Sequence, residues 1–489
     1  MDTLILTILI LLPALAGLAL PVFKIKNRTA KLCMLMAAML ITAAANVYMA
    51  GRTGYEAELF SITDALTIGF RVDGMSVLFS LIASFGWICA GAFSFVYMKH
   101  EESEDRFFCF FMLVETTLMG MDFASNAVTM YVFYELLTLM SVPLVLHNLS
   151  REAVAAGLKF LFYSVAGGFL GLWAIFVLQR YTLTLDFVAG GSLDMSLVSG
   201  HEQLILISVF LGILGFGAKA GLYPLHGWLP TAHPVAPAPA SAVLSAIIAK
   251  AGVLAIFRMI FCVVGTDFLK GTWCQYTLLG ISLMTVFMGS MMAYRENILK
   301  KRLAYSTVSQ ISYVLSGAFL LTAGGALGAL AHVVFHAAIK TCLFLCAGAI
   351  IFATGKTKVD ELRGIGREMP ITVWSFTLAS LGLIGIPPFN GFVSKWYLAS
   401  ASLESGLSVF SWLMPVVLLV SALLTAGYLL PVTVRGFFPG KDYLPSGGKP
   451  EKNILLWLTP LLLALFVLTT GICTGGLMDW LSDIVGSVM

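Results

Sequence analysis

Long apolar runs, separated by short polar stretches, fill almost the whole chain. A membrane-spanning helix needs about 20 apolar residues, and fourteen runs come close to that length. Their approximate bounds are 3–23, 32–50, 75–98, 107–121, 124–147, 153–179, 204–225, 238–264, 274–294, 302–322, 326–354, 371–403, 408–435 and 453–475. The pattern predicts an all-α polytopic membrane protein. The boundary between the fourth and fifth runs, around 121–126, is the least sharply marked.

The composition supports this class. Hydrophobic residues make up 59% of the chain and charged residues 11%, against about 25% charged residues in an average soluble domain. Ordinary soluble domains are therefore excluded, and a net charge of +3 is too small to indicate a nucleic-acid partner. The eight cysteines form no CxxC pair, so neither a zinc ribbon nor an iron–sulfur site is indicated. We expect no metal and no cofactor in this chain.

The basic loop residues alternate strongly between successive connections. Odd-numbered connections hold 19 of them: Lys24, Lys26, Arg28, Lys31, Lys99, Arg106, Arg151, Arg295, Lys300, Lys301, Arg302, Lys356, Lys358, Arg363, Arg367, Arg435, Lys441, Lys449 and Lys452. Even-numbered connections hold 4: Arg52, Arg71, Arg180 and Lys270. The positive-inside rule then predicts a multi-pass protein of a prokaryotic cell membrane, with basic loops in the cytoplasm and both termini outside.

Six basic residues remain inside the apolar runs: Lys159, Lys219, Lys250, Arg258, Lys340 and Lys395. Lys159 and Arg258 are within about two turns of a helix end, so their side chains can snorkel to the interface. Each of the other four costs roughly 2.5–3.5 kcal/mol in mid-membrane. Two deep acids, Glu115 and Glu135, accompany them. Such costly residues indicate a function.

Buried lysines are suited to proton transfer, because burial disfavours their charged form and a nearby carboxylate restores it. Glu135 is the candidate partner of Lys219, since each is the deep charge of its run. The alternative is a static ion pair that fixes helix packing. Four lysines in separate runs favour proton transfer.

A second group is His332, His336 and Lys340, whose spacing of four residues places them on one stripe of a helix over about 12 Å. Histidine suits a proton relay because its unperturbed pKa is near 6.5. Haem or metal ligation and a packed polar stripe are the alternatives.

Glycine and proline interrupt two runs beside their lysines, at 212–224 and 382–395. Broken helices mark the ion sites of many transporters. His226 and His233 follow the first break in a proline-rich connection, and we expect them at the cytoplasmic mouth.

Three motifs carry a family resemblance. They occupy 219–234, 303–313 and 385–397 and include the sequences Lys-Ala-Gly-Leu-Tyr-Pro-Leu-His-Gly-Trp-Leu-Pro and Gly-Ile-Pro-Pro-Phe-Asn-Gly-Phe-Val-Ser-Lys. The chain resembles the antiporter-like subunit family over roughly 60–435. That family comprises Mrp-type cation/proton antiporter subunits, the proton-pumping membrane subunits of respiratory complex I, and related subunits of membrane-bound group 4 hydrogenases. Lys395 agrees with the D-type Mrp subunit, whereas other motifs resemble the other branches.

The resemblance implies fourteen core helices with two inverted five-helix repeats, and breaks in the seventh and twelfth helices. It divides the chain into an N-terminal three-helix segment at 1–106, repeats at 107–264 and 274–435, and a C-terminal part at 436–489. It also implies a structural role for Asp73.

The resemblance further implies a proton relay through Glu135, Lys219, Lys250, His332, His336, Lys340 and Lys395. In it Glu135 pairs with Lys219, Lys250 bridges to the central axis, and Lys395 exchanges protons with the outer side. Candidate accessory groups are Glu115, Lys159, His226 and His233.

The sequence therefore predicts a proton-translocating, antiporter-like subunit that works with other membrane subunits in the lipid bilayer. Protons are the expected ions, with Na⁺ as a second candidate. No flavin, nucleotide or cluster motif occurs, so any redox reaction belongs to partner subunits. The alternatives are a self-standing secondary transporter for a small solute and a quinone- or haem-binding redox protein.

Overall fold

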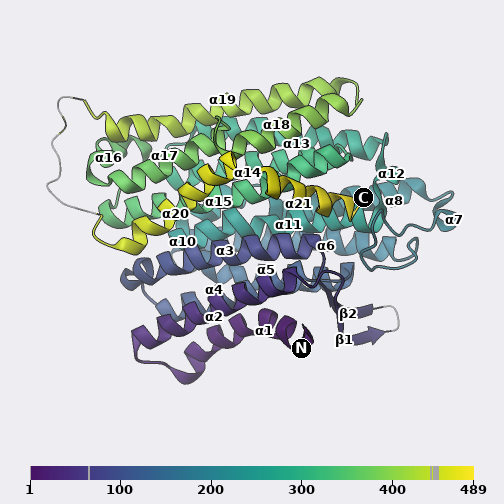
Figure 1. Ribbon diagram of the computed structural model, residues 1–489, viewed down its shortest axis with the longest axis horizontal. Coiled ribbons are helices and arrows are strands. Elements are labelled where there is room, and N and C mark those ends of the chain that lie inside the picture. The colour runs from purple at the N-terminus through teal and green to yellow at the C-terminus, as the bar shows by residue number, and fades with distance from the viewer. Residues whose placement is uncertain (1, 64–65, 441–442, 444–450) are drawn as a thin grey trace.

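Long helices lying side by side make up the protein. The computed structural model describes residues 2–63, 66–440, 443 and 451–489. The unbroken long helices are α1 (Asp2–Phe23), α2 (Arg28–Ala50), α3 (Gly74–Tyr97), α4 (Glu104–Asp122), α5 (Ala127–Val145), α6 (Arg151–Leu178), α8 (Glu202–Ala220), α13 (Trp273–Arg295), α14 (Leu299–Phe319), α15 (Ala323–Thr354), α19 (Val409–Phe437) and α20 (Ile454–Ile472). Most of them run along the longest axis of the molecule (Figure 1).

Two of the predicted spans are broken where glycine and proline cluster. After α8 the chain leaves helical geometry at Gly221, which has φ +82°, and resumes as the short α9 (Leu229–Val235). The other break separates α17 (Pro370–Ile384) from α18 (Asn390–Glu404), and Gly385 ends α17 with φ +88°. Glycine is needed at both points because side chains disfavour positive φ. The predicted interruptions are therefore present.

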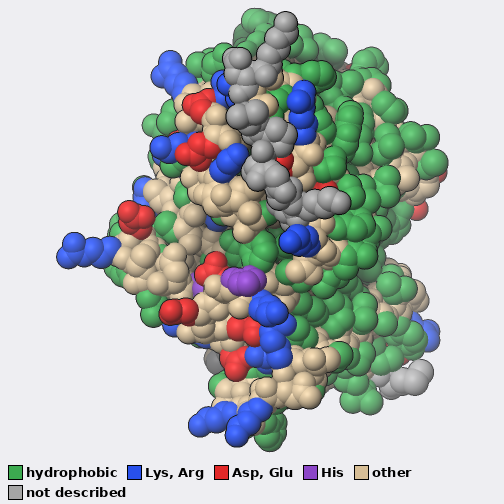
Figure 2. Space-filling view, turned by 90° about the vertical axis from the view of Figure 1, so that its left-hand side faces the viewer, with side chains coloured by type: hydrophobic (Ala, Val, Ile, Leu, Met, Phe, Trp, Pro, Cys, Tyr) green, Lys and Arg blue, Asp and Glu red, His purple; other side chains and the backbone are tan. Residues whose placement is uncertain are grey.

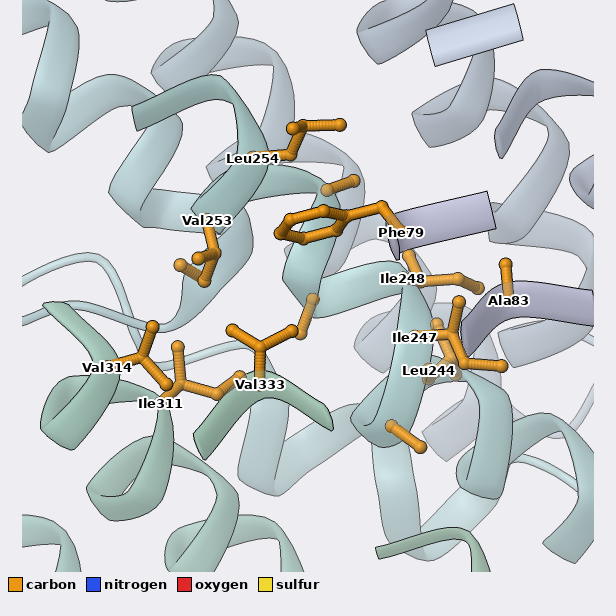
Figure 3. Packing of buried hydrophobic residues seen from close by; sticks show 14 of the residues in the cluster. Phe79, Ala83, Leu244, Ile247, Ile248, Val253, Leu254, Ile311, Val314 and Val333 are labelled. Carbon is orange, nitrogen blue, oxygen red and sulfur yellow. The ribbon is translucent and has the colours of Figure 1, made fainter. Parts of the chain in front are cut away.

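The most deeply buried span changes its helical geometry along its length. It comprises α10 (Ala238–Val243), the π-helix η2 (Leu244–Ile248), α11 (Ala249–Phe257) and the π-helix η3 (Arg258–Val264). Within its most apolar stretch of 18 residues, 100% of the residues are buried. Apolar side chains from α3, α14 and α15 surround η2 and α11 (Figure 3). This span is therefore the central helix of the fold.

The two ends of the bundle differ. At one end lie both chain termini and the antiparallel hairpin of β1 (Glu56–Thr63) and β2 (Leu66–Arg71) (Figure 1); we call this end the hairpin face. At the opposite end, the basic face, charged side chains gather between apolar flanks (Figure 2). Lys441 and Lys449, two of the predicted basic loop residues, lie outside the described residues.

Short helices connect the long ones at the hairpin face and at the basic face, and one more follows the last long helix. They are η1 (Met98–His100), α7 (Met195–Val198), α12 (Thr266–Leu269), η4 (Val359–Leu362), α16 (Ile365–Glu368) and α21 (Gly475–Gly486). α21 and the hairpin were not expected from the sequence. α21 packs on the start of α3, where Gly74 meets Ile484.

Each of the fourteen predicted runs overlaps helical structure, and eleven helices within the described ranges are long and apolar enough to cross a membrane. α4 is not among these eleven helices because it is rich in charged residues, and α14 is not because it is rich in serine. α17 and α18 are each shorter than a span. The protein is a multi-pass membrane protein, while the number of crossings stays a prediction.

Candidate functional site

A series of buried polar side chains crosses the middle of the bundle on α5, α8, α11, α14, α15 and α18. Lys219, Lys340 and His336 are each 0% exposed, and Lys250 is 2% exposed. Glu135 and Lys395 are partly buried. All seven residues of the predicted relay therefore lie inside the bundle.

Lys219 projects from the last turn of α8 towards α5. Its Nζ donates hydrogen bonds to the backbone oxygen of Tyr134, at 2.7 Å, and to Thr138 Oγ1, at 2.8 Å. The same ammonium lies 3.8 Å from the centre of the Tyr134 ring, a cation–π distance. The partners of Lys219 are thus neutral groups.

Glu135 stands beside this lysine without an ion pair to it among the described residues. Its carboxylate packs against α6, where a Cβ on Gly168 would meet Oε1 at 1.7 Å. Oε1 is buried and has no hydrogen-bond partner in the described part of the protein. The charges of Glu135 and Lys219 nevertheless interact electrostatically. The predicted partners therefore interact electrostatically but form no ion pair within the described residues.

Lys250 is the second residue of α11, directly after the π-helix η2. Its Nζ donates to the backbone oxygen of Ser245 at 3.3 Å, a carbonyl that lies five residues earlier in the wider turn. Ser245 Oγ lies 2.6 Å from Thr307 Oγ1 on α14. α11 also packs closely on α8, where Gly252 meets the backbone of Ala220, so Lys250 and Lys219 lie on adjacent helices.

The two histidines of α15 are stacked on one another, with ring centres 5.9 Å apart. His332 is well partnered: its Nδ1 lies 2.8 Å from Ser394 Oγ on α18, and its Nε2 lies 3.2 Å from Gln310 Oε1 on α14. Tyr313 stacks on its other side at 5.5 Å. His332 therefore joins three helices.

His336, in contrast, has no hydrogen-bond partner at either ring nitrogen among the described residues. It interacts electrostatically with Lys250, Lys340, Lys395 and His332. Buried polar groups are usually hydrogen-bonded to protein or to ordered water. The unpartnered ring in the middle of four basic groups therefore indicates hydration at this point.

Lys340 also binds neutral oxygens. Its Nζ donates to the backbone oxygen of Leu303, at 2.9 Å, and to Ser306 Oγ, both on α14. α14 lines this region with hydroxyl and amide groups, which explains its low hydropathy. The predicted stripe of His332, His336 and Lys340 thus faces a polar helix.

Lys395 lies at the break between α17 and α18. Its Nζ donates to the backbone oxygens of Leu383, at 2.6 Å, and Ile384, at 2.9 Å. These are the last carbonyls of α17, where the helix dipole favours a cation. The ammonium also lies 5.1 Å from the Tyr313 ring, which connects Lys395 to the His332 end of the series.

The accessory residues fall into separate groups. His226 interacts electrostatically with Lys159, and its Nδ1 has no partner in the described chain. His233 is 0% exposed, stacks on Phe344 at 4.8 Å, and interacts with Lys300 and Lys340. Glu115 lies on α4 and belongs to neither group.

Two buried features were missed from the sequence. Arg258 does not snorkel: it is 2% exposed, and its guanidinium binds both carboxylate oxygens of Asp73, at 2.6 and 2.7 Å. The Asp73 carboxylate, at the start of α3, neutralises the Arg258 guanidinium inside the protein, so this side chain need not reach the membrane surface. Asp122, 3% exposed at the end of α4, was overlooked because it falls at the uncertain boundary between two runs.

The family follows from direct comparison. Residues 124–425 match the NADH:quinone oxidoreductase/Mrp antiporter transmembrane family. Residues 60–108 match the N-terminal part of chain 5 of complex I NADH-ubiquinone oxidoreductase. The first match covers more than half of the chain. The protein belongs to the NADH:quinone oxidoreductase/Mrp antiporter family and is an antiporter-like membrane subunit.

Relatives come from several kinds of complex. The chain is 32% identical over 381 residues to NADH-quinone oxidoreductase subunit N of Desulforudis audaxviator, covering 77% of this chain and 74% of the relative. It is 32% identical to hydrogenase-4 component B of Escherichia coli and 31% identical to Na⁺/H⁺ antiporter subunit A1 of Staphylococcus haemolyticus. These two alignments cover 67% and 83% of this chain, respectively, but only 50% and 52% of the relatives.

Solved structures share the fold. A chain of the Mrp complex from Dietzia sp. superposes with a TM-score of 0.84 at 21% identity, covering 99% of this chain and 98% of that one. A chain of an archaeal membrane-bound sulfane sulfur reductase gives 0.84 at 22% identity, with 99% of both chains covered. A chain of Thermus thermophilus complex I gives 0.76 at 18%, covering 97% and 98%.

Proposed function

We propose that this protein moves protons across the membrane through the buried series Glu135, Lys219, Lys250, His332, His336, Lys340 and Lys395. One observation carries the proposal. Each of the four lysine ammoniums binds only carbonyl or hydroxyl oxygens, and none has a carboxylate within ion-pair distance among the described residues. A buried cation without a counter-ion is costly. Such a lysine can release its proton and take it up again.

Neighbouring charges couple the successive proton transfers. The charged form of Lys219 is favoured when Glu135 is ionised beside it, and less so when that carboxylate is neutralised. Lys250, Lys340 and His336 interact with one another, so a proton arriving on one disfavours charge on the next. Lys395 receives the proton at the helix break. Water bridges the intervals between side chains.

The relay has an entrance on the basic face. His233 interacts electrostatically with Lys340 and with Lys300, which lies in the first turn of α14. Lys300 Nζ donates to the backbone oxygen of Pro234 at 3.2 Å. His226 and Lys159 form a second polar group beside the first helix break. We assign proton uptake to these residues, with the basic face in the cytoplasm and both termini outside.

The protein works as one subunit of a larger membrane complex. Support comes from its relatives and structural neighbours, which belong to NADH-quinone oxidoreductase, hydrogenase and Na⁺/H⁺ antiporter assemblies. Any redox chemistry takes place on other subunits, and Na⁺ is the second candidate ion. The repeats at 107–264 and 274–435 supply the two halves of the relay. Neither the fold nor the comparisons favour a self-standing transporter of small solutes.

Two substitutions, at the first and the last lysine of the series, test the proposal. In the purified complex reconstituted into vesicles, Lys219→Ala and Lys395→Ala should each abolish proton translocation, because each removes a carrier that its neighbours cannot replace. Lys270→Ala, at an exposed position on the hairpin face, is the control and should leave translocation unchanged. Assembly is checked by subunit composition. Full translocation in either variant would overturn the relay.

A further inference from the structure

A second set of buried polar groups lies between α2, α3 and α4, on different helices from the relay. Its centre is Glu115, which is 0% exposed and whose two carboxylate oxygens have no hydrogen-bond partner among the described residues. Native proteins leave few buried polar atoms unsatisfied, and each such atom needs an explanation. The need for an explanation is greatest for Glu115, because neither oxygen of this buried carboxylate accepts a hydrogen bond within the described residues.

One cluster shows how the three helices align. Asn46 Nδ2 on α2 donates to Ser84 Oγ on α3 at 2.6 Å, and lies 3.4 Å from Met119 Sδ on α4. These three side chains therefore lie at the same depth. From this depth the neighbouring turns of all three helices can be compared.

One turn closer to the basic face, each helix presents a polar group that has no hydrogen-bond partner in the described part of the chain. On α2 it is Thr42 Oγ1, four residues before Asn46; on α4 it is Glu115, four residues before Met119. On α3, which runs in the opposite direction, it is Trp87 Nε1. Residues three or four apart lie on one face of a helix, so these groups lie on the same helix faces as the Asn46, Ser84 and Met119 cluster.

Polar groups continue from there towards the hairpin face. Ser76, Ser80 and Ser84 follow one stripe of α3 and are almost fully buried. On α4, Asp122 lies seven residues after Glu115, on the same face and about 10 Å along the axis. Its Oδ2 is buried and also has no partner within the described ranges.

We call the set Thr42, Ser76, Ser80, Ser84, Trp87, Glu115 and Asp122 the polar lane. It ends beside an open cavity on the hairpin face. The cavity has a volume of about 650 Å³ and is lined by Arg71, Asp73 and Arg258, among others. Arg258 interacts electrostatically with Asp122. The amide of Arg71 donates to the backbone oxygen of Phe123, the residue after Asp122, at 2.7 Å. Asp122 therefore lies between the lane and the cavity.

Towards the basic face the lane is closed by aromatic rings. Trp87 and Phe111 contact one another with ring centres 4.7 Å apart, and Phe107 stacks on Phe111 at 5.6 Å. All three side chains are no more than 1% exposed. The lane is therefore polar towards the hairpin face and apolar towards the basic face.

We propose that the lane between α2, α3 and α4 is a water-filled half-channel that carries protons between the hairpin face and Glu115, by way of Asp122. Water satisfies the free oxygens of Glu115 and Asp122 and the free Trp87 donor, as it does at other buried polar sites. The half-channel is a proton-binding site separate from the relay. It requires no transfer through Lys219 or Lys340.

Carbodiimide labelling tests the proposal, because dicyclohexylcarbodiimide enters the bilayer and reacts with protonated carboxyl groups. Vesicles containing the whole complex are labelled while the pH is changed on one side only, and modification of Glu115 is measured by mass spectrometry. Labelling should fall when the pH is raised at the hairpin face and should not respond at the basic face. Labelling that follows the basic face, or no labelling at any pH, would overturn the half-channel.

Two variants sharpen this result. Asp122→Asn should slow the response of Glu115 labelling to the pH at the hairpin face by about 100-fold, the lower part of the range for removing a positioned proton-transfer group. Asp483→Asn, which changes an exposed acid at the rim of the same cavity, should not alter it. An unchanged response in Asp122→Asn contradicts the route, as does protection of Glu115 by Na⁺. Because the measurement does not involve transport, it is independent of the outcome at Lys219.

Discussion

Single atoms around Glu135 determine how its carboxylate can move. Oε1 is packed against the bare Cα of Gly168 on α6, while Lys219 is held on the other side by Tyr134 and Thr138. The carboxylate can therefore lie near the lysine without being locked to it. A static ion pair would not have this freedom.

Gly168→Ala tests this arrangement. The new methyl group would meet Glu135 Oε1 at 1.7 Å, and the flexible carboxylate should swing away while the helices stay in place. We expect proton translocation to fall by about 10²-fold, as for small displacements of reacting groups. Gly280→Ala, where nothing lies within 4 Å of the added methyl, is the control. Undiminished translocation in Gly168→Ala would show that the position of Glu135 is unimportant.

At this scale the sequence identified the unusual residues but not their partners. Lysines within apolar runs are visible because each is costly in a membrane. The atoms that bind them are backbone oxygens and hydroxyls, such as the Tyr134 carbonyl and Ser306, which occur everywhere in the chain. Asp122 was missed because a charge at the end of a run cannot be distinguished from a loop charge without the helix boundary.

At the scale of elements, the two breaks present backbone groups to the interior. The end of α17 offers the carbonyls of Leu383 and Ile384 to Lys395, which only a helix terminus can do. The close approach of α18 to α17 makes this possible, since a Cβ on Gly391 would meet the Gly382 oxygen at 1.9 Å.

Gly391→Ala should therefore push α18 away from α17. The clash is with backbone, so a shift of the whole helix is required, and overpacking of this kind typically costs about 1–3 kcal/mol. We expect a lower thermal unfolding temperature of the purified complex. Gly476→Ala, which has open space around it, should not lower it. Equal stability of the two variants would contradict the packing of the break.

The buried pair of Asp73 and Arg258 joins the start of α3 to η3. Asp73→Ala leaves the guanidinium buried without its partner and removes the cap that accepts the amide of Ser76. Loss of one partner of a buried pair costs about 3–5 kcal/mol, and we expect the lower part of this range because the Asp73 side chain is 23% exposed. Denaturant unfolding measures the loss. A change below about 1 kcal/mol would contradict a stabilising pair.

The pair also predicts the direction of a pH effect. Burial alone would raise the pKa of Asp73, but the Arg258 guanidinium and the hydrogen bonds from Ser76 together outweigh it and hold that pKa below its usual value. The folded pKa is then lower than the unfolded one, so the stabilisation is complete above the unfolded pKa and is lost as the pH falls through the folded pKa. The difference in unfolding free energy between wild type and Asp73→Ala should shrink on acidification in that range. A difference that is independent of pH would contradict it.

Helix breaks were predictable from sequence, whereas the π-helices were not. Glycine and proline mark the ends of α8 and α17 because they end helices by known geometry. The π-helices η2 and η3 consist of ordinary apolar residues for the most part, and their wider turns depend on packing against neighbouring helices. Their contribution to the position of Lys250 therefore became visible only in three dimensions.

For the whole molecule, the distribution of charge predicts the orientation in the membrane. Lys99 is exposed at the basic face and Lys270 at the hairpin face. With the exposed cysteines Cys33 and Cys473 replaced by serine, Lys270→Cys in intact cells should react with a membrane-impermeant maleimide. Lys99→Cys should react only after the membrane is opened. The reverse result would place the basic face outside and contradict the positive-inside assignment.

Proton flux through the lysines and histidines inside the bundle can be measured at a single residue. Lys340 lies in the middle of the series, where it interacts with Lys250 and His336. The most direct measurement is proton flux into vesicles that contain the assembled complex with Lys340→Ala. We expect the proton flux to fall to the level of vesicles without protein, while the subunit composition is unchanged. Flux equal to that of the wild type would contradict it.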